Sequence, residues 1–104
     1  MIRVRHRFGG NLHSLVVVGH ADHSEHGNDI VCAGTSAIVY SLLGWLENHK
    51  HELPFLIRHE RSGEALIFCR GGGEADTAFQ MAVIGLAQIA QKYPDHVAVE
   101  IIPH

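Results

Sequence analysis

The sequence predicts an α+β fold of order ββαββαβ, with two helices packed on a mostly antiparallel sheet. Three observations predict it. Five short segments carry the apolar patterns of strands, two longer segments carry the apolar patterns of helices, and turn residues separate most of them. The length of 104 residues leaves room for a single domain, covering residues 1–104.

The first expected element is a hairpin. Residues 2–8 alternate apolar side chains with three arginines, which is the period of a strand with one face in water. Residues 9–11, Gly-Gly-Asn, supply the positive-φ positions of a tight turn into Leu12–Val18. The uninterrupted apolar run 15–18 indicates that the end of this second strand is covered on both faces.

A polar loop and a long helix are expected next. Residues 20–29 show no periodicity, and Asp29 is a good N-cap for a helix running from Ile30 to about Asn48. Residues 30–46 carry no charge, but they are marginal in length for a bilayer and contain several small or polar residues. A buried helix, and no membrane association, is therefore expected.

A second hairpin, a second helix and a final strand are expected in the second half of the chain. Residues 55–61 and 64–70 form a hairpin around Ser62-Gly63, residues 75–92 form a helix that Pro94 stops, and residues 97–101 form a closing strand. The glycine run 71–73 resembles a phosphate-binding loop but lacks its Lys-Ser/Thr. The acidic residues that follow it would repel a phosphate, so a turn and helix start are expected.

The amino-acid composition limits the classes of function that fit this chain. Hydrophobic residues are 46% and charged residues 18% of the chain, as in globular proteins. The net charge of −3 argues against direct nucleic-acid binding. The N-terminal segment has no signal-peptide core, so a cytoplasmic protein with both cysteines reduced is expected. Both helices are more apolar than one sheet face requires, which favours a homodimer.

A thiol and an imidazole form the first candidate site. Cys32 occupies the third position of the helix capped by Asp29, where the positive helix end favours thiolate over thiol. His20 follows the second strand, and the loop returns from it to the same helix start. Ser36 lies one helical turn beyond Cys32, and Asp29 could orient the imidazole. A base beside a nucleophile is the minimum for covalent catalysis.

Other interpretations stay open. A cysteine is often only a small buried side chain, which is the expected role of Cys69 inside a strand and an alternative for Cys32. The run His20, His23 and His26 could instead bind zinc or nickel, with Asp22 and Glu25 nearby. No Cys-x-x-Cys or His-Glu-x-x-His pattern accompanies these histidines.

The chain also resembles a known family. Gly19-His20-Ala21, then the run 27–36, Gly-Asn-Asp-Ile-Val-Cys-Ala-Gly-Thr-Ser, are similar to the signature of the ribosomal-processing cysteine proteases called Prp. Residues 84–94, which end in Tyr-Pro, resemble that family's second helix and its end. The resemblance therefore spans nearly the whole chain.

The resemblance implies a bacterial homodimer that removes a short N-terminal extension from a large-subunit ribosomal protein, without a cofactor. The family's catalytic dyad matches His20 and Cys32, its supporting residues match Asp29 and Ser36, and its mobile, substrate-gated loop matches residues 21–28. Two alternatives remain: a metal-binding module that uses the loop histidines, and a non-catalytic dimer that accompanies ribosome assembly.

Overall fold

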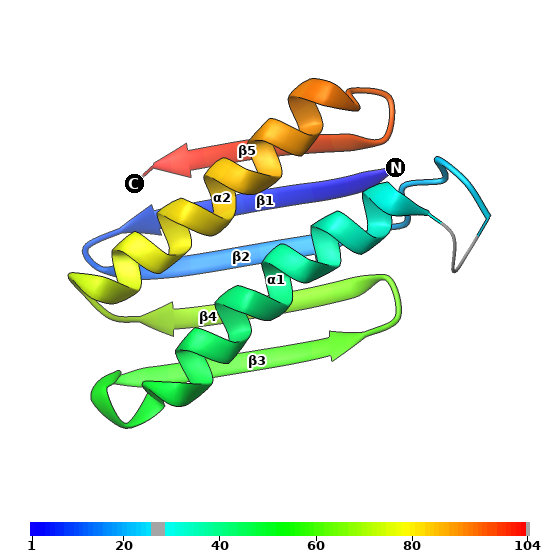
Figure 1. Ribbon diagram of the computed structural model, residues 1–104. Coiled ribbons are helices and arrows are strands. Elements are labelled where there is room, and N and C mark those ends of the chain that lie inside the picture. The colour runs from blue at the N-terminus through cyan, green and yellow to red at the C-terminus, as the bar shows by residue number, and fades with distance from the viewer. Residues whose placement is uncertain (26–28, 104) are drawn as a thin grey trace.

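The computed structural model describes residues 1–25 and 29–103 as a five-stranded sheet with two helices on one face (Figure 1). The predicted order ββαββαβ is confirmed, with a short 3-10 helix, η1, added after the first helix. The elements are β1 Ile2–Gly9, β2 Leu12–Val18, α1 Ile30–Asn48, η1 Lys50–Glu52, β3 Phe55–Arg61, β4 Glu64–Arg70, α2 Glu74–Lys92 and β5 Val97–Pro103.

The order of the strands across the sheet is β3-β4-β2-β1-β5. All neighbours are antiparallel except β1 and β5, so the predicted mostly antiparallel sheet is confirmed. Val18 at the end of β2 pairs with Glu64 at the start of β4. This register brings the exit of β2 beside the β3–β4 turn, where the Gly19 N–H donates to the Gly63 carbonyl at 2.8 Å.

The core lies between the sheet and the helices. Its largest fully buried side chains come from both layers and include Leu15, Leu43, Leu46, Ile67, Phe79 and Leu86. The two helices also contact each other, and a Cβ on Gly85 of α2 would lie 3.0 Å from Ile38 Cδ1 of α1. A side chain larger than hydrogen at Gly85 would therefore require the Ile38 side chain to shift.

The opposite face of the sheet has no helix over it (Figure 1). Val16 and Val18 point to that face and are only half-buried, although residues 15–18 were expected to be covered on both sides. That expectation is wrong for the single chain. Val16 pairs with Leu66 of β4, so neighbouring aliphatic side chains shield one another without a second layer.

By length and composition α1 could cross a membrane, and it is the one such helix in the described part of the chain. Six of its residues are buried in the molecule: Val31, Thr35, Val39, Leu42, Leu43 and Leu46. This burial matches the helix expected from the sequence. A core helix of this kind passes the same length and composition test.

A chain of buried polar side chains crosses the far end of the core. His6 on β1 and His13 on β2 are almost fully buried, and His6 Nε2 lies 3.0 Å from His13 Nδ1. His13 Nε2 lies 2.6 Å from Asp76 Oδ1 of α2. An ionised carboxylate only accepts, so His13 Nε2–H donates to Asp76. Both rings are nearly parallel to the Phe79 ring.

Candidate active site

The N-terminus of α1 is capped as the sequence predicts. Asp29 has extended backbone angles, and its Oδ1 accepts hydrogen bonds from the N–H groups of Val31 at 2.9 Å and Cys32 at 3.2 Å. These are two of the backbone donors that a helix leaves without intrahelical partners. The cap fixes Cys32 in the first turn, at the positive end of the helix.

The second oxygen of Asp29 holds the preceding loop. Its Oδ2 accepts from the N–H groups of His23 at 2.8 Å and Ser24 at 3.2 Å. Burial of this carboxyl would raise its pKa, but these four backbone donors outweigh burial and lower the pKa of Asp29. The charged carboxylate therefore ties the loop to the helix start, which explains its presence without a bond to imidazole.

The Cys32 thiol is partly exposed and lies beside the exit of β2. Its Sγ accepts the backbone N–H of Ala21 at 3.3 Å. Ala21 is itself buried, and its carbonyl lies 2.8 Å from His96 Nδ1, which must donate because a carbonyl only accepts. No local sequence pattern predicts this contact, because His96 lies 75 residues after Ala21 in the chain.

Two glycines place His20. Gly19 has φ of 102°, and a Cβ there would lie 2.2 Å from the Met1 carbonyl oxygen. Only glycine fits so close to backbone in that conformation. His20, just after β2, lies beside the turn between β3 and β4. Its ring contacts Gly63, where an added Cβ would come within 2.7 Å of Nε2. Gly63 was expected only as a turn residue, and its contact with His20 could not be read from the sequence.

A cavity of about 530 Å³ joins the predicted residues. His20, Cys32 and Ser36 all line it, and the same three side chains line an adjoining cavity of about 420 Å³ that reaches Asp29. The far wall of the larger cavity is the β3–β4 hairpin, residues 60–65. The Thr35 hydroxyl of α1, which also lines this cavity, is the one buried side-chain oxygen or nitrogen in the described residues that has no partner.

The second cysteine is structural, as the sequence suggests. Cys69 on β4 is completely buried. Burial, and then the negative charge of Asp76, raise the pKa of the Cys69 thiol. A neutral buried thiol is a poor nucleophile, and of the two cysteines Cys32 has the more accessible thiol.

The loop histidines form no metal-ligand group within residues 1–25 and 29–103. The His23 ring packs edge-on against the rings of Tyr93 at 5.3 Å and His96 at 5.0 Å. Asp22 instead forms an ion pair of 3.5 Å with the N-terminal ammonium group. His26, the third histidine of the predicted run, and residues 27–28 of the expected mobile loop lie outside the described residues.

The fold agrees with comparisons to known proteins. A family model described as Cysteine protease Prp matches residues 1–98. This chain belongs to the Prp family. Two relatives carry the name Ribosomal processing cysteine protease Prp. The one from Mycoplasma genitalium is 34% identical over 85 residues, which are 82% of this chain and 84% of that protein. The one from Staphylococcus aureus (strain Mu50) is 29% identical over 90 residues, 85% of each chain.

Solved structures support the same assignment. A crystal structure of the essential ribosomal processing protease Prp from S. aureus, with a covalently linked product peptide, superimposes with a TM-score of 0.84 at 28% identity. It covers 97% of this chain and 99% of that chain. A Streptococcus mutans protein at 23% identity shares the fold, with a TM-score of 0.77. The predicted fold, family and cysteine-protease class are therefore confirmed for this Prp.

Proposed function

We propose that this Prp is an endopeptidase that removes a short N-terminal extension from a large-subunit ribosomal protein, with Cys32 as nucleophile and His20 as its base. One observation carries the proposal. Cys32 Sγ lies at the capped start of α1 and lines the same cavity as His20. The peptide complexes of the S. aureus relative support a peptide substrate for this family.

In the dyad mechanism the acyl group of the substrate is transferred first to Cys32 and then to water, and His20 carries the protons. His20 takes the thiol proton of Cys32, and the thiolate attacks the carbonyl carbon of the scissile peptide bond. The tetrahedral intermediate collapses as the C–N bond breaks, and His20 gives the proton to the leaving amine. Water then attacks the thioester, with His20 as base, and releases the extension as a free acid.

The negative oxygen of the tetrahedral intermediate needs a donor near the sulfur. The N–H groups at the start of α1 already have acceptors: those of Val31 and Cys32 donate to the Asp29 side chain, and Ala33 N–H donates to the Asp29 carbonyl. The Ala21 N–H already points at Cys32 Sγ. It is therefore the better candidate for this role.

Ser36 and Asp29 would support the dyad in different ways. Ser36 is exposed in both cavities one turn beyond Cys32, so its hydroxyl can donate to bound peptide. Asp29 would act through position alone, by holding the loop and the helix start together. A ribosomal substrate implies work in the cytoplasm.

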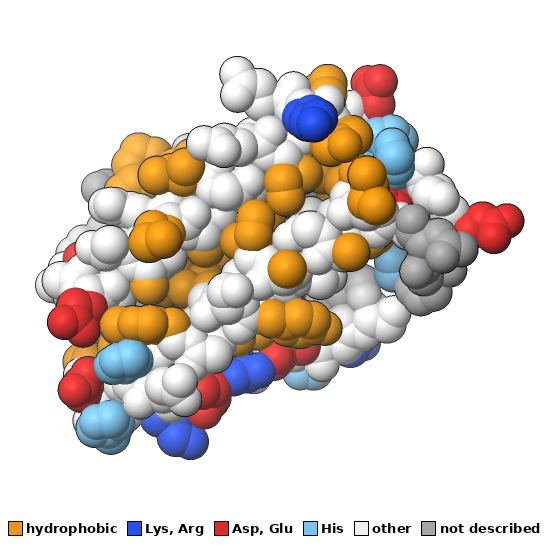
Figure 2. All heavy atoms as spheres, in the orientation of Figure 1, with side chains coloured by type: hydrophobic (Ala, Val, Ile, Leu, Met, Phe, Trp, Pro, Cys, Tyr) orange, Lys and Arg blue, Asp and Glu red, His pale blue; other side chains and the backbone are white. Residues whose placement is uncertain are grey.

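We also propose that this Prp acts as a homodimer that pairs through its helices. Figure 2 shows hydrophobic side chains gathered along and between α1 and α2 on the outer face. Tyr40 of α1, and Met81 and Ile84 of α2, are each more than half exposed. Apolar side chains this exposed on neighbouring helices are typical of an interface.

Cleavage of a synthetic peptide that spans the extension and the mature N-terminus of the substrate tests the function. We expect Cys32→Ala and His20→Ala to fold, to bind the peptide and to lose cleavage. Cys69→Ala is the matched control and should keep cleavage. A chelator that abolishes cleavage, together with an active Cys32→Ala, would support the metal-binding alternative instead.

A further inference from the structure

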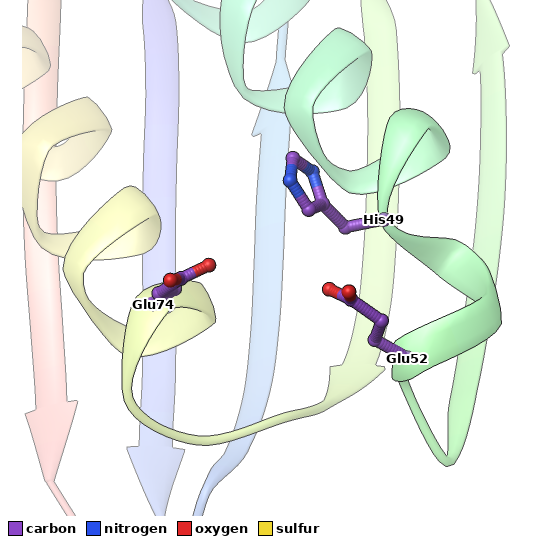
Figure 3. A group of neighbouring side chains, drawn as sticks. All are labelled: His49, Glu52 and Glu74. Atoms are coloured by element: carbon purple, nitrogen blue, oxygen red, sulfur yellow. The ribbon is translucent and has the colours of Figure 1, made fainter.

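At the end of α1 opposite Cys32, three side chains that can ligate a metal ion point toward a common centre (Figure 3). They are His49 after α1, Glu52 of η1 and Glu74 at the start of α2. One ligand atom from each lies within 4.8 Å of the other two. The polypeptide thus brings together groups from three separate elements, none of which belongs to the cavity around Cys32.

The imidazole of His49 is held ready to ligate. His49 Nδ1 lies 2.8 Å from the Trp45 carbonyl oxygen, so Nδ1 carries the hydrogen and the lone pair remains on Nε2. The ring also stacks on the Trp45 ring, with centroids 4.0 Å apart. A ligating histidine commonly donates its other ring N–H to a carbonyl in this way, because the bond fixes both tautomer and orientation.

The two carboxylates lack a strong cation between them. Glu52 pairs only with His51, an exposed imidazole 3.8 Å away, and Glu74 forms no ion pair within residues 1–25 and 29–103. The nearby Lys50 ammonium pairs with Glu47. The Arg70 guanidinium, which borders the same hollow, donates to the Gly10 carbonyl. The two negative carboxylates repel each other at this distance, whereas a cation bound between them would attract both.

We propose that His49, Glu52 and Glu74 form a binding site for one divalent transition-metal ion, of which Zn²⁺ is the best match. One imidazole nitrogen and two carboxylate oxygens are ligands that Zn²⁺ accepts, and water would complete a tetrahedral set. The imidazole disfavours Mg²⁺ and Ca²⁺, which take oxygen ligands. The acidic residues at the start of α2 argued against phosphate binding after the glycine run 71–73. The same negative charge favours the binding of a cation.

The site would act as a structural link. It joins η1 to the first turn of α2, and so connects segments on either side of the β3–β4 hairpin. His49 follows Cys32 by 17 residues along α1, which separates the two sites by about 26 Å. Bound Zn²⁺ should therefore raise the melting temperature and leave the chemistry at Cys32 unaffected, because ligands that bind only the folded state stabilise it.

Titration with Zn²⁺ tests the site, in a Cys32→Ala background so that the thiolate does not bind the ion. We expect one Zn²⁺ per chain by calorimetry, a higher melting temperature, and visible Co²⁺ absorption without a thiolate charge-transfer band. His49→Ala, Glu52→Gln and Glu74→Gln should each weaken binding by at least about tenfold. Asp95→Asn, an exposed acid outside the cluster with the same charge change, should bind as the parent does.

Two results would overturn the proposal. One is Zn²⁺ affinity that is equal in the parent and in all three cluster variants. The other is binding that is lost in His23→Ala but kept in Glu74→Gln, which would place the ion in the loop instead. Peptide cleavage by the chain with native Cys32 is measured separately, so failure of the metal site leaves the protease proposal untouched.

Discussion

Gly63 determines how closely His20 can approach the β3–β4 turn. In Gly63→Ala the new methyl would lie 2.7 Å from His20 Nε2, and φ of 73° would be strained. We expect peptide cleavage to fall by at least about tenfold, because misplacing a catalytic group by about 1 Å can cost about a hundredfold.

Gly10→Ala is the matched control for this variant. Gly10 has φ of 56°, so its backbone strain is similar, but nothing lies within 4 Å of the added Cβ. Both variants should lose about 1–2 kcal/mol of stability, while only Gly63→Ala should lose cleavage. Equal activity in the two variants, measured at saturating peptide and matched folded fraction, would contradict the contact.

The two thiols should differ sharply in reactivity. Cys32 is partly exposed at a helix start, whereas Cys69 is completely buried and burial raises the pKa of its thiol. Iodoacetamide near neutral pH should label Cys32 first, by at least about tenfold in rate. Mapping of the adducts by mass spectrometry measures this, and faster labelling of Cys69 in the folded protein would reverse the assignment.

At the scale of elements, Asp29 has two separable roles. Asparagine caps helices about as well as aspartate, but one of its two side-chain groups is a donor and cannot accept the N–H groups of His23 and Ser24. Asp29→Asn should therefore keep the helix cap but lower the melting temperature, because the hydrogen bonds to His23 and Ser24 are lost. It should also speed amide exchange in residues 21–25 and lower cleavage several-fold. Full activity with faster exchange would show that the loop contact does not position the site.

The buried histidine chain makes stability depend on pH. Burial, and then the neighbouring His13, lower the pKa of His6 to about 4, against 6.5 for an unperturbed imidazole. Between about pH 6.5 and pH 4, His6 therefore binds a proton in the unfolded chain but not in the folded chain. Stability from this group is complete above pH 6.5 and is lost as the pH falls toward 4, by about 2 kcal/mol near pH 5.

Urea denaturation of the parent and of His6→Phe at several pH values measures this term. Phenylalanine keeps a ring against Phe79 and cannot titrate, although it removes the hydrogen bond between His6 and His13. We expect the variant to be less stable near neutral pH but to lose less stability on acidification. His13, Asp76 and Cys69 are unchanged in both proteins, so an equal pH dependence would assign the effect to them.

Much of the site was predictable because its main parts are local in sequence. Asp29, Cys32 and Ser36 lie on consecutive turns of one helix start, where capping and helix periodicity alone fix their relation. The start of α2 at Glu74, one residue before the predicted start, is a difference of the usual size at helix ends. The contacts of Gly63 with His20 and of His96 with Ala21 depend on strand order, which no local pattern contains.

At the scale of the whole molecule, the helix face should be a dimer interface. Met81 and Ile84 on α2 are exposed apolar side chains at helical spacing. Sedimentation equilibrium at micromolar concentration should give about twice the chain mass of 11.4 kDa. Met81→Glu should shift the mass toward that of a monomer, whereas Ile57→Glu, at an exposed apolar residue of β3, should not. A monomer with full activity would refute the dimer.

The central claim is that Cys32 forms a covalent acyl-enzyme with the N-terminal extension. The most direct measurement is intact mass spectrometry of the protein, quenched in acid during turnover of the extension peptide. The account predicts a mass increase equal to the extension minus water, mapped to Cys32, present in Cys69→Ala and absent in Cys32→Ala. Cleavage that proceeds in Cys32→Ala, or an adduct that maps to Cys69, would contradict it.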